Sequence, residues 1–539
     1  MFDLDSEQVL FADDNTLDSP NDTVYSVIGF INRMQRLADK TVLIGELRGD
    51  LVSLTASASL DLQALANFSA GVDNFYNSPK DFYAVINNCN FFIANADTSL
   101  RKRNDPVFIK EYAVVKAYRA WTYLQLAQIY GSVPFITEPI LTEKQAKAEY
   151  EKKDIVFISE YFIDDLLPFI NTPYPGYGSI NGFNSRKFFI PVRVLLGDLC
   201  LWAGRYSESA MYYHEYLTDI NNILPIEKNR ITWNQNQNTF ENWNDSYRSM
   251  FNDVSSIETI TFIPMEANKF DGLVSDLRNI YNSTLDNDYF YQATISKSLL
   301  NLSKEQSNCV VYFNEATSGR DTLYAPLINN QNDLLVGDLR LYATTEKRTV
   351  SNTSLSTYST DRQTIRKINR HIPIYRRGVV YLRYAEALNR AGFPTAAFTV
   401  LKYGMTESNI GKYVDSTEIK AASAYNLLTW DKNEFTSDIT IGIHSRGSGE
   451  ASANENYIIP ALASKQDTIT YVEDLICDEM ALESGFEGYR FYDLVRISMR
   501  RNDNSYLAGK IAARDGETAI NQDLYNKLLE RSNWFLPLK

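Results

Sequence analysis

Long segments with apolar residues at helical spacing, closed by glycine or proline, restrict the fold of this sequence more than any other feature. Residues 110–130 carry Ala117, Trp121 and Leu124 on one face and stop at Gly131. Apolar side chains that recur every three or four positions before a helix-ending glycine predict an amphipathic helix. We therefore expect a helix over 110–130, with Trp121 and Leu124 in the core.

Two further segments, 378–391 and 471–483, show the same spacing. Two turns, at 204–210 and 391–397, each combine a small residue, an aromatic residue two positions later and alanine in the following segment. This combination lets two antiparallel helices approach closely, as in a tetratricopeptide pair, and it also fits an ordinary helical hairpin. Because two turns so far apart do not make a regular array, we predict an all-α fold with tetratricopeptide-like pairs.

The predicted helices alternate with long polar loops. These loops are rich in Gly, Asn, Ser and aromatic residues, and they cover residues 168–183, 232–247, 279–293 and 348–364. Loops of this length inside a compact protein usually carry function or are disordered. Since the loops are interleaved with the helices and no linker separates them, we predict one domain over residues 1–539.

The charge of the chain argues against nucleic acid as a partner. There are 53 Lys and Arg against 67 Asp and Glu, so the net charge is −14. Binding to a phosphate backbone needs a basic surface. No apolar run is long enough to cross a bilayer, and the residues after Met1 lack the basic and apolar regions of an export signal. The chain is therefore either cytoplasmic or has lost such a signal.

The four cysteines, Cys89, Cys200, Cys309 and Cys477, form no CxxC pair. Three of them, Cys89, Cys200 and Cys477, lie in apolar, helix-like stretches, where a cysteine is usually a small buried residue. We predict neither a disulfide framework nor a zinc site.

Signatures of common enzyme sites are missing from the sequence. There is no phosphate-binding glycine loop and no HExxH, and His214, His371 and His444 are far apart. Ser445 beside His444 imitates a nucleophile elbow but lacks its first glycine. We therefore predict no catalytic residues, no metal site and no cofactor.

A cluster of charges near the C-terminus allows two interpretations. Glu479, Glu483 and Glu487 recur at helical spacing, close to Arg490 and Arg496. Paired carboxylates could hydrolyse a glycosidic bond, which leaves a helical glycoside hydrolase as an alternative function. We favour a structural network of charges that holds two helices together.

Two loop regions are the best candidates for a ligand site, because function concentrates on loops held by a rigid scaffold. In the first, Arg48 and Asp50 flank a glycine, so the backbone can bend and both charges can converge on one ligand. This candidate region combines residues 46–50 with residues 73–77, where Asn74 and Tyr76 offer hydrogen bonds and a stacking face. The alternative is that Arg48 and Asp50 form a local structural ion pair.

In the second region, Tyr281, Tyr289 and Tyr291 alternate with Asn and Asp. Such a pattern is typical of an aromatic platform with polar edges, which suits a sugar ring or a peptide backbone. The alternative is that these tyrosines are ordinary packing residues.

Four stretches in order along the chain resemble the SusD/RagB family. Residues 116–135 are similar to its "RAxxYxxLxxxYGxVPL" segment, and the turn at 204–210 matches a helical hairpin of the family. Residues 381–389 resemble "YLxYAEALN", and residues 479–496 resemble "ExxxELxFEGxRxxDLxR". The ending at 533–537 is similar to the family's "LPIP"-type tail. One departure is Met480, at a position where the family often has Arg.

The resemblance implies a surface-exposed lipoprotein of the cell outer membrane with an all-helical SusD-like fold. Its acylated cysteine would have preceded Met1 or been replaced there. It also implies a SusC-like TonB-dependent outer-membrane barrel as partner. The four motifs are expected to hold the fold together, and ligand residues are expected on the variable loops.

The function that follows is capture of oligosaccharides for import through that transporter, with oligopeptide capture as the alternative within the family. A helical-repeat adaptor that binds other proteins is a different class. The sequence signature of such an adaptor, a regular repeat of about 34 residues, is missing.

Overall fold

The computed structural model describes residues 22–102, 104–219, 224–226, 232–234, 239–241, 247, 250, 253–281, 291–324, 337–351, 359–365, 367, 370–436 and 438–538. Helices dominate, as the sequence predicted. They are α1 (Asp22–Leu47), α2 (Leu60–Ala66), α3 (Pro79–Asn95), α4 (Ile109–Tyr130), α5 (Glu143–Ala146), α6 (Ile155–Leu166), α7 (Val192–Ala203), α8 (Tyr206–Leu217), α10 (Leu277–Tyr281), α11 (Lys297–Glu305), α12 (Leu339–Thr344), α13 (Arg377–Arg390), α14 (Pro394–Lys402), α15 (Glu407–Tyr413), α16 (Ser416–Ala422), α17 (Ser445–Ser448), α18 (Lys465–Ser484), α19 (Arg490–Arg501), α20 (Asn504–Ala512) and α21 (Gln522–Leu528).

The strands are short and join only into antiparallel pairs within the described ranges. The pairs are β1 (Val52–Leu54) with β11 (Ala293–Ile295), β2 (Arg101–Lys102) with β3 (Asp105–Pro106), β4 (Val133–Pro134) with β5 (Lys152–Lys153), β6 (Ser179–Ile180) with β7 (Phe183–Asn184), β8 (Thr232–Asn234) with β9 (Thr239–Glu241), β10 (Thr259–Ile263) with β16 (Ile372–Arg376), β12 (Cys309–Asn314) with β13 (Gly319–Tyr324), and β14 (Thr345–Ser351) with β15 (Ser359–Ile365). Two of these pairs join distant parts of the chain: β1 pairs with β11, and β10 pairs with β16.

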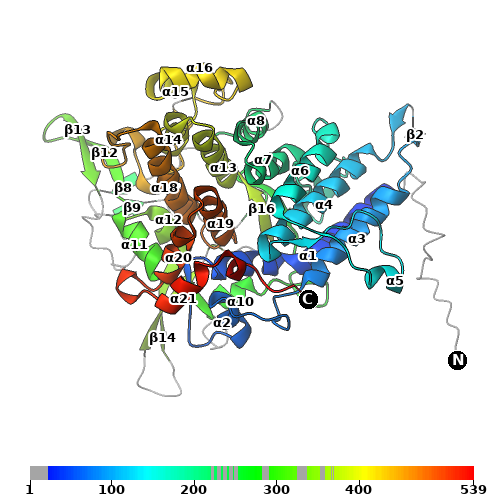
Figure 1. Cartoon of the computed structure of the whole chain (residues 1–539). Helices are drawn as coiled ribbons and strands as arrows, with labels where there is room; N and C mark the ends of the chain where they lie inside the picture. Colours follow the sequence, from blue (N-terminus) through cyan, green and yellow to red (C-terminus); the bar gives the residue numbers. More distant parts are fainter. Residues whose placement is uncertain are drawn as a thin grey trace.

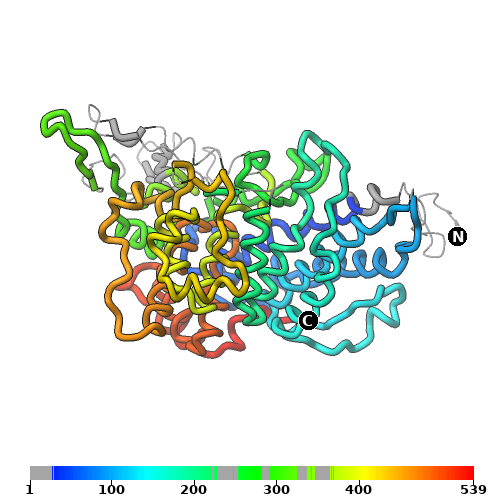
Figure 2. The backbone as a smooth tube through the Cα atoms, turned by 90° about the horizontal axis from the view of Figure 1, so that it is seen from above, coloured from blue at the N-terminus to red at the C-terminus, as the bar shows by residue number. Residues whose placement is uncertain are grey.

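Seven helices form a continuous row in which each packs on the next: α3, α4, α6, α7, α8, α13 and α14 (Figure 1). The long helix α1 packs against α3, α4 and α19, and α18 packs against α13 and α14. Seen from above, the blue beginning of the described chain lies at one end of the molecule and the orange segments lie at the other (Figure 2). The row therefore supplies a rigid scaffold between the two ends.

The two tetratricopeptide-like turns lie where the sequence placed them, between α7 and α8 and between α13 and α14. Gly204 and Gly392 adopt the left-handed conformation that ends each first helix, with φ of 81° and 94°. This conformation favours glycine because it has no Cβ. In the first pair the two helices pack so closely that a Cβ on Gly197 would lie 2.4 Å from the ring of Tyr213. The predicted helical pairs are confirmed.

A contiguous hydrophobic core extends along the chain from Val27 to Leu536. Trp121 and Leu124 are buried in it, which confirms the prediction for 110–130. Cys89, Cys200 and Cys477 are buried free thiols, also as predicted. Met480, the departure from the family pattern, is likewise buried. One core over this length is compatible with one domain over residues 1–539, which stays a prediction.

Candidate functional site

Arg48 and Asp50 point into the core, which corrects the expectation that they converge on a ligand. The guanidinium of Arg48 lies 4.1 Å from the ring centre of Phe491 and donates a hydrogen bond to the carbonyl of Trp534. Asp50 accepts hydrogen bonds from Arg490 Nε at 2.5 Å and Nη2 at 2.9 Å. Burial alone would raise the pKa of Asp50, but Arg490 holds it below its ordinary value. Both residues join the turn after α1 to α19, so we do not propose them as ligand residues.

Asn74 and Tyr76 lie in a loop that packs against α2. The side chain of Asn74 donates to the carbonyl of Asp61 at 3.0 Å and accepts from the N–H of Tyr76 at 3.0 Å. Tyr76 is half-buried, and burial raises its pKa to about 12. Between these two residues stands Phe75, whose side chain is 70% exposed. Its ring meets that of Tyr76 edge to face, with 5.1 Å between the ring centres.

Of the three tyrosines predicted to form an aromatic platform, Tyr281 is excluded by its burial. Tyr281 ends α10 and is fully buried, so it offers no face to a ligand. Tyr289 lies outside the described residues. Tyr291 is half-buried at a positive φ of 92°, and its carbonyl accepts a hydrogen bond from Thr55 at 2.5 Å. A ligand role for Tyr291, as for Asn74 and Tyr76, remains a prediction.

The structure brings the two predicted regions together around α2. Thr55 donates its N–H to the carbonyl of Gln292 at 2.9 Å, and the N–H of Ser59 donates to Gln292 Oε1 at 2.8 Å. The N–H of Phe75 donates to Asp61 Oδ1 at 3.2 Å. We call this region the α2 surface. It comprises Ser59, Leu60, Asp61, Val72, Asn74, Phe75, Tyr76, Tyr291 and Gln292.

The α2 surface carries exposed apolar side chains. Leu60 is 82% exposed and Phe75 is 70% exposed, and Val72 is exposed as well. Exposed apolar groups beside polar groups are typical of interaction sites. An aromatic face beside amide and carboxylate oxygens can stack on a sugar ring and bind its hydroxyls. Phe75 lies inside the predicted region 73–77, although no role was predicted for its ring, and Leu60 lies outside both predicted regions.

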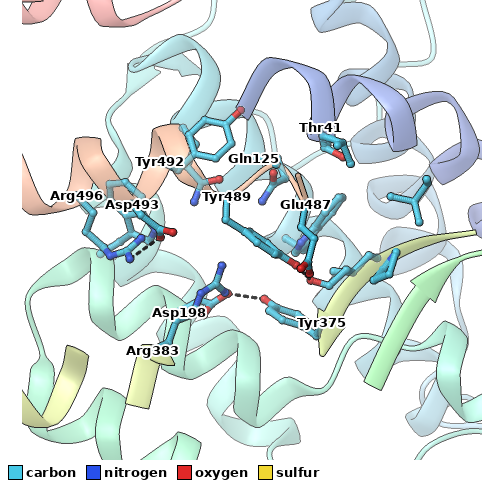
Figure 3. Close-up of a pocket in the computed structure, with 18 of the residues that line it drawn as sticks. Thr41, Gln125, Asp198, Tyr375, Arg383, Glu487, Tyr489, Tyr492, Asp493 and Arg496 are labelled. Atoms are coloured by element: carbon cyan, nitrogen blue, oxygen red, sulfur yellow. Dashed lines mark hydrogen bonds and ion pairs between the residues drawn. The ribbon is translucent and has the colours of Figure 1, made fainter. Parts of the chain in front are cut away.

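A polar cavity lies where α1, α4, α7, α13, α19 and β16 meet (Figure 3). Asp198 accepts hydrogen bonds from Tyr375 at 2.6 Å and from Arg383 at 2.5 Å, and Asp493 pairs with Arg496 at 2.7 Å. The volume of about 40 Å³ holds roughly three water molecules and no sugar ring. Several family-like stretches contribute to its lining, in line with a structural role for these motifs.

The predicted charge network around Glu479, Glu483 and Glu487 is present, but its partners differ from those expected. Glu483 is fully buried and binds Arg340 at 3.1 Å, Arg376 at 2.7 Å and Arg446 at 2.8 Å. These arginines come from α12, β16 and α17. Glu483 therefore fixes α18 to three other segments, while α18 is joined to α19 by a different pair, Glu473 with Arg501 at 2.6 Å.

Ser445 and His444 do not form a nucleophile and base. The hydroxyl of Ser445 donates to the carbonyl of Lys402 at 3.2 Å. His444 Nδ1 lies 2.8 Å from Glu479, and its ring stacks on Tyr457. Within the described ranges, no group of three or more His, Cys, Asp or Glu is placed to hold a metal ion. No helix there is long and apolar enough to cross a bilayer.

Comparison with known proteins gives one matching family and many similar structures. A model of the SusD family matches residues 232–538. No curated protein matches the chain. Among solved structures, a SusD superfamily protein from Bacteroides vulgatus aligns with a TM-score of 0.61 at 12% identity over 97% of this chain and 96% of that one.

Two further solved structures have a similar fold. A SusD superfamily protein from Bacteroides thetaiotaomicron has a TM-score of 0.58 at 15% identity, over 89% of both chains. Surface glycan-binding protein A from Bacteroides fluxus has a TM-score of 0.55 at 16% identity, over 93% of this chain and 92% of that one. At these identities the likeness establishes a shared fold.

Proposed function

Because this chain belongs to the SusD family, we propose that it is a surface nutrient-binding lipoprotein of the outer membrane. In this proposal it captures oligosaccharides and delivers them to a TonB-dependent transporter. Similar structures include a surface glycan-binding protein and a SusD-like carbohydrate-binding protein. The proposal is for binding without turnover.

The observation that carries the ligand site is the exposed ring of Phe75 on the α2 surface. A phenyl ring that is 70% exposed leaves apolar area in contact with water. Stacking on the apolar face of a sugar removes that area from water. In this proposal Asp61 and Gln292, on the same surface, form hydrogen bonds with the sugar hydroxyls. The loop is held by the hydrogen bonds of Asn74, so the ring is positioned before ligand arrives.

We expect Phe75→Ala to weaken binding of the cargo oligosaccharide about tenfold, which is about 1.4 kcal/mol. The loss follows from the missing stacking face, and the fold should be unchanged because the ring is exposed. A glycan array would identify the cargo, and calorimetry would then give its Kd for parent and variant.

Phe313→Ala serves as the matched control, because Phe313 is 60% exposed on β12, away from the α2 surface. Equal affinity of the parent and Phe75→Ala for a confirmed cargo would remove the α2 surface from the proposal. Binding of a peptide library in place of any glycan would replace the cargo class with oligopeptides.

We also expect the protein to purify from native membranes in mild detergent together with a TonB-dependent barrel. A net charge of −14 gives no attraction to an anionic membrane surface. The complex therefore needs a shape-matched interface, of about 1,600 Å² in a typical stable complex. A tagged chain, washed at high salt and analysed by mass spectrometry, tests this. As a control, an outer-membrane protein with a known partner carries the same tag and should keep that partner. If the control keeps its partner and the chain is recovered without a barrel, the partnership is contradicted.

A further inference from the structure

A second hollow lies on the loop between α6 and α7, and it shares no residue with the α2 surface. It is an open depression of about 520 Å³ lined by Gly176, Gly178, Ser179, Asn184, Ser185 and Arg186. This volume lies within the usual range for small-ligand sites, about 300–1,000 Å³. The hollow is thus large enough for a sugar residue, unlike the polar cavity in Figure 3.

The walls of the hollow are fixed to the core. The ring of Tyr174 stacks on Phe189, and that of Tyr177 meets the same ring edge to face, with centres 6.0 Å and 5.9 Å apart. The hydroxyl of Tyr177 donates to Glu111 at 2.8 Å. On the other side, the backbone of Ser185 donates to the carbonyl of Gly178 at 2.9 Å. A site held in this way loses little conformational freedom when a ligand binds.

Polar groups in the hollow have unused hydrogen-bonding capacity. Ser185 is only 1% exposed, yet its hydroxyl makes no hydrogen bond with the described residues. A hydroxyl that lines the hollow can donate one hydrogen bond to a ligand atom or a water molecule and can also accept one. The guanidinium of Arg186 is exposed and has neither an ion pair nor a hydrogen bond within the described part of the chain. A Cβ on Gly176 or Gly178 would meet nothing within 4 Å, so a ligand can approach the backbone there.

The charge of the hollow indicates the class of ligand. Arg186 is the only ionisable residue among the six that line it, in a chain whose net charge is −14. A guanidinium binds a carboxylate through two parallel hydrogen bonds. Because the other five lining residues are uncharged, the charge of Arg186 favours an anionic group over a neutral one.

We propose that this hollow binds a carboxylate-bearing sugar residue, with Arg186 on the carboxylate and Ser185 and Asn184 on the ring oxygens. This inference rests on the proposed glycan-binding function and adds acidic glycans to its cargo. The hollow and the α2 surface would then bind different residues of one chain or different glycans.

Calorimetry on the full chain tests this with short oligomers of galacturonic and glucuronic acid, each paired with its neutral, carboxyl-reduced counterpart. We expect a uronate to bind and its neutral counterpart to bind at least about tenfold more weakly. Arg186→Gln should weaken uronate binding about tenfold, and Arg186→Lys should weaken it less because the charge remains. Gly176→Leu should abolish binding by filling the hollow.

Two control variants match these changes. Arg320→Gln removes an exposed arginine on β13, and Gly411→Leu adds a side chain on α15 where the Cβ also meets open space. Both should bind the uronate as the parent does. The inference about this hollow is overturned if Arg186→Gln and Gly176→Leu leave uronate binding unchanged. It is also overturned if the parent binds neutral glycans but no uronate. In both cases the proposed glycan-binding function still stands. A parent that binds no glycan of either kind overturns the proposed function itself.

Discussion

Glu483→Leu is expected to lower the free energy of unfolding by about 3–5 kcal/mol, or to prevent folding. The carboxylate of Glu483 is fully buried and contacts the guanidinium groups of Arg340, Arg376 and Arg446. Removing it leaves three buried cations with fewer anionic partners in a region that excludes water. Urea denaturation followed by circular dichroism measures the loss.

Glu143→Leu is the control for this substitution, because Glu143 forms an exposed ion pair with Lys147 on α5. Exposed pairs contribute about 0–1 kcal/mol, so this variant should unfold close to the parent. A Glu483→Leu protein as stable as Glu143→Leu would show that the network around α18 adds no stability.

The same network predicts acid sensitivity. Burial alone would raise the pKa of Glu483, but Arg446, Arg376 and Arg340 lower it from 4.5 to about 2. Burial would likewise raise the pKa of Glu386, but Arg496 and Arg500 lower it to about 2. A carboxylate with a lowered pKa in the folded state stabilises the protein above its ordinary pKa, and the contribution is lost as the pH falls. Stability should therefore fall between about pH 4.5 and about pH 2.

Other carboxylates act in the opposite direction. Burial raises the pKa of Asp39 to about 6 and that of Glu46 to about 7, so their contributions weaken as the pH rises toward neutrality. These contributions cancel when Glu483→Leu is compared with the parent at each pH. The difference in the free energy of unfolding between the parent and Glu483→Leu should shrink from pH 4.5 toward pH 2. A difference that stays constant contradicts the assignment of the acid sensitivity to Glu483.

Asp50→Ala is expected to cost about 3–5 kcal/mol of stability, with no direct effect on ligand affinity. Asp50 is the carboxylate partner of Arg490, and truncation leaves that guanidinium buried without its anion. Denaturation gives the stability, and calorimetry at a temperature where the variant stays folded gives the affinity. Pairing the change with Arg490→Met should recover part of the loss, because it removes the orphaned charge.

Asp73→Ala is the matched control, since Asp73 is an exposed acid in the neighbouring loop. It should leave stability within about 0.5 kcal/mol of the parent. An Asp50→Ala protein of normal stability that no longer binds its cargo would restore Asp50 to the ligand site.

The helices and the helical pairs could be predicted from local sequence alone. The expected helix over 110–130 is α4, and the turns at Gly204 and Gly392 end α7 and close the α13–α14 pair. These features depend on residues within one or two helical turns, so the 3.6-residue period and the helix-ending glycines are sufficient to predict them. The resemblance to the SusD/RagB family, carried by short motifs, was predictable for the same reason, and the match over 232–538 confirms it.

Which of the candidate residues face solvent depends on tertiary packing. Arg48 and Asp50 have the composition of a ligand loop, but their partners Trp534 and Arg490 lie more than four hundred positions away. Tyr281 and Phe75 are both aromatic residues among Asn and Asp, yet one is fully buried and the other is 70% exposed. Local sequence does not encode this difference, because burial depends on which distant segment packs over the loop. The loop that forms the hollow around Arg186 is likewise held by tertiary contacts, those of Tyr174 and Tyr177 with Phe189.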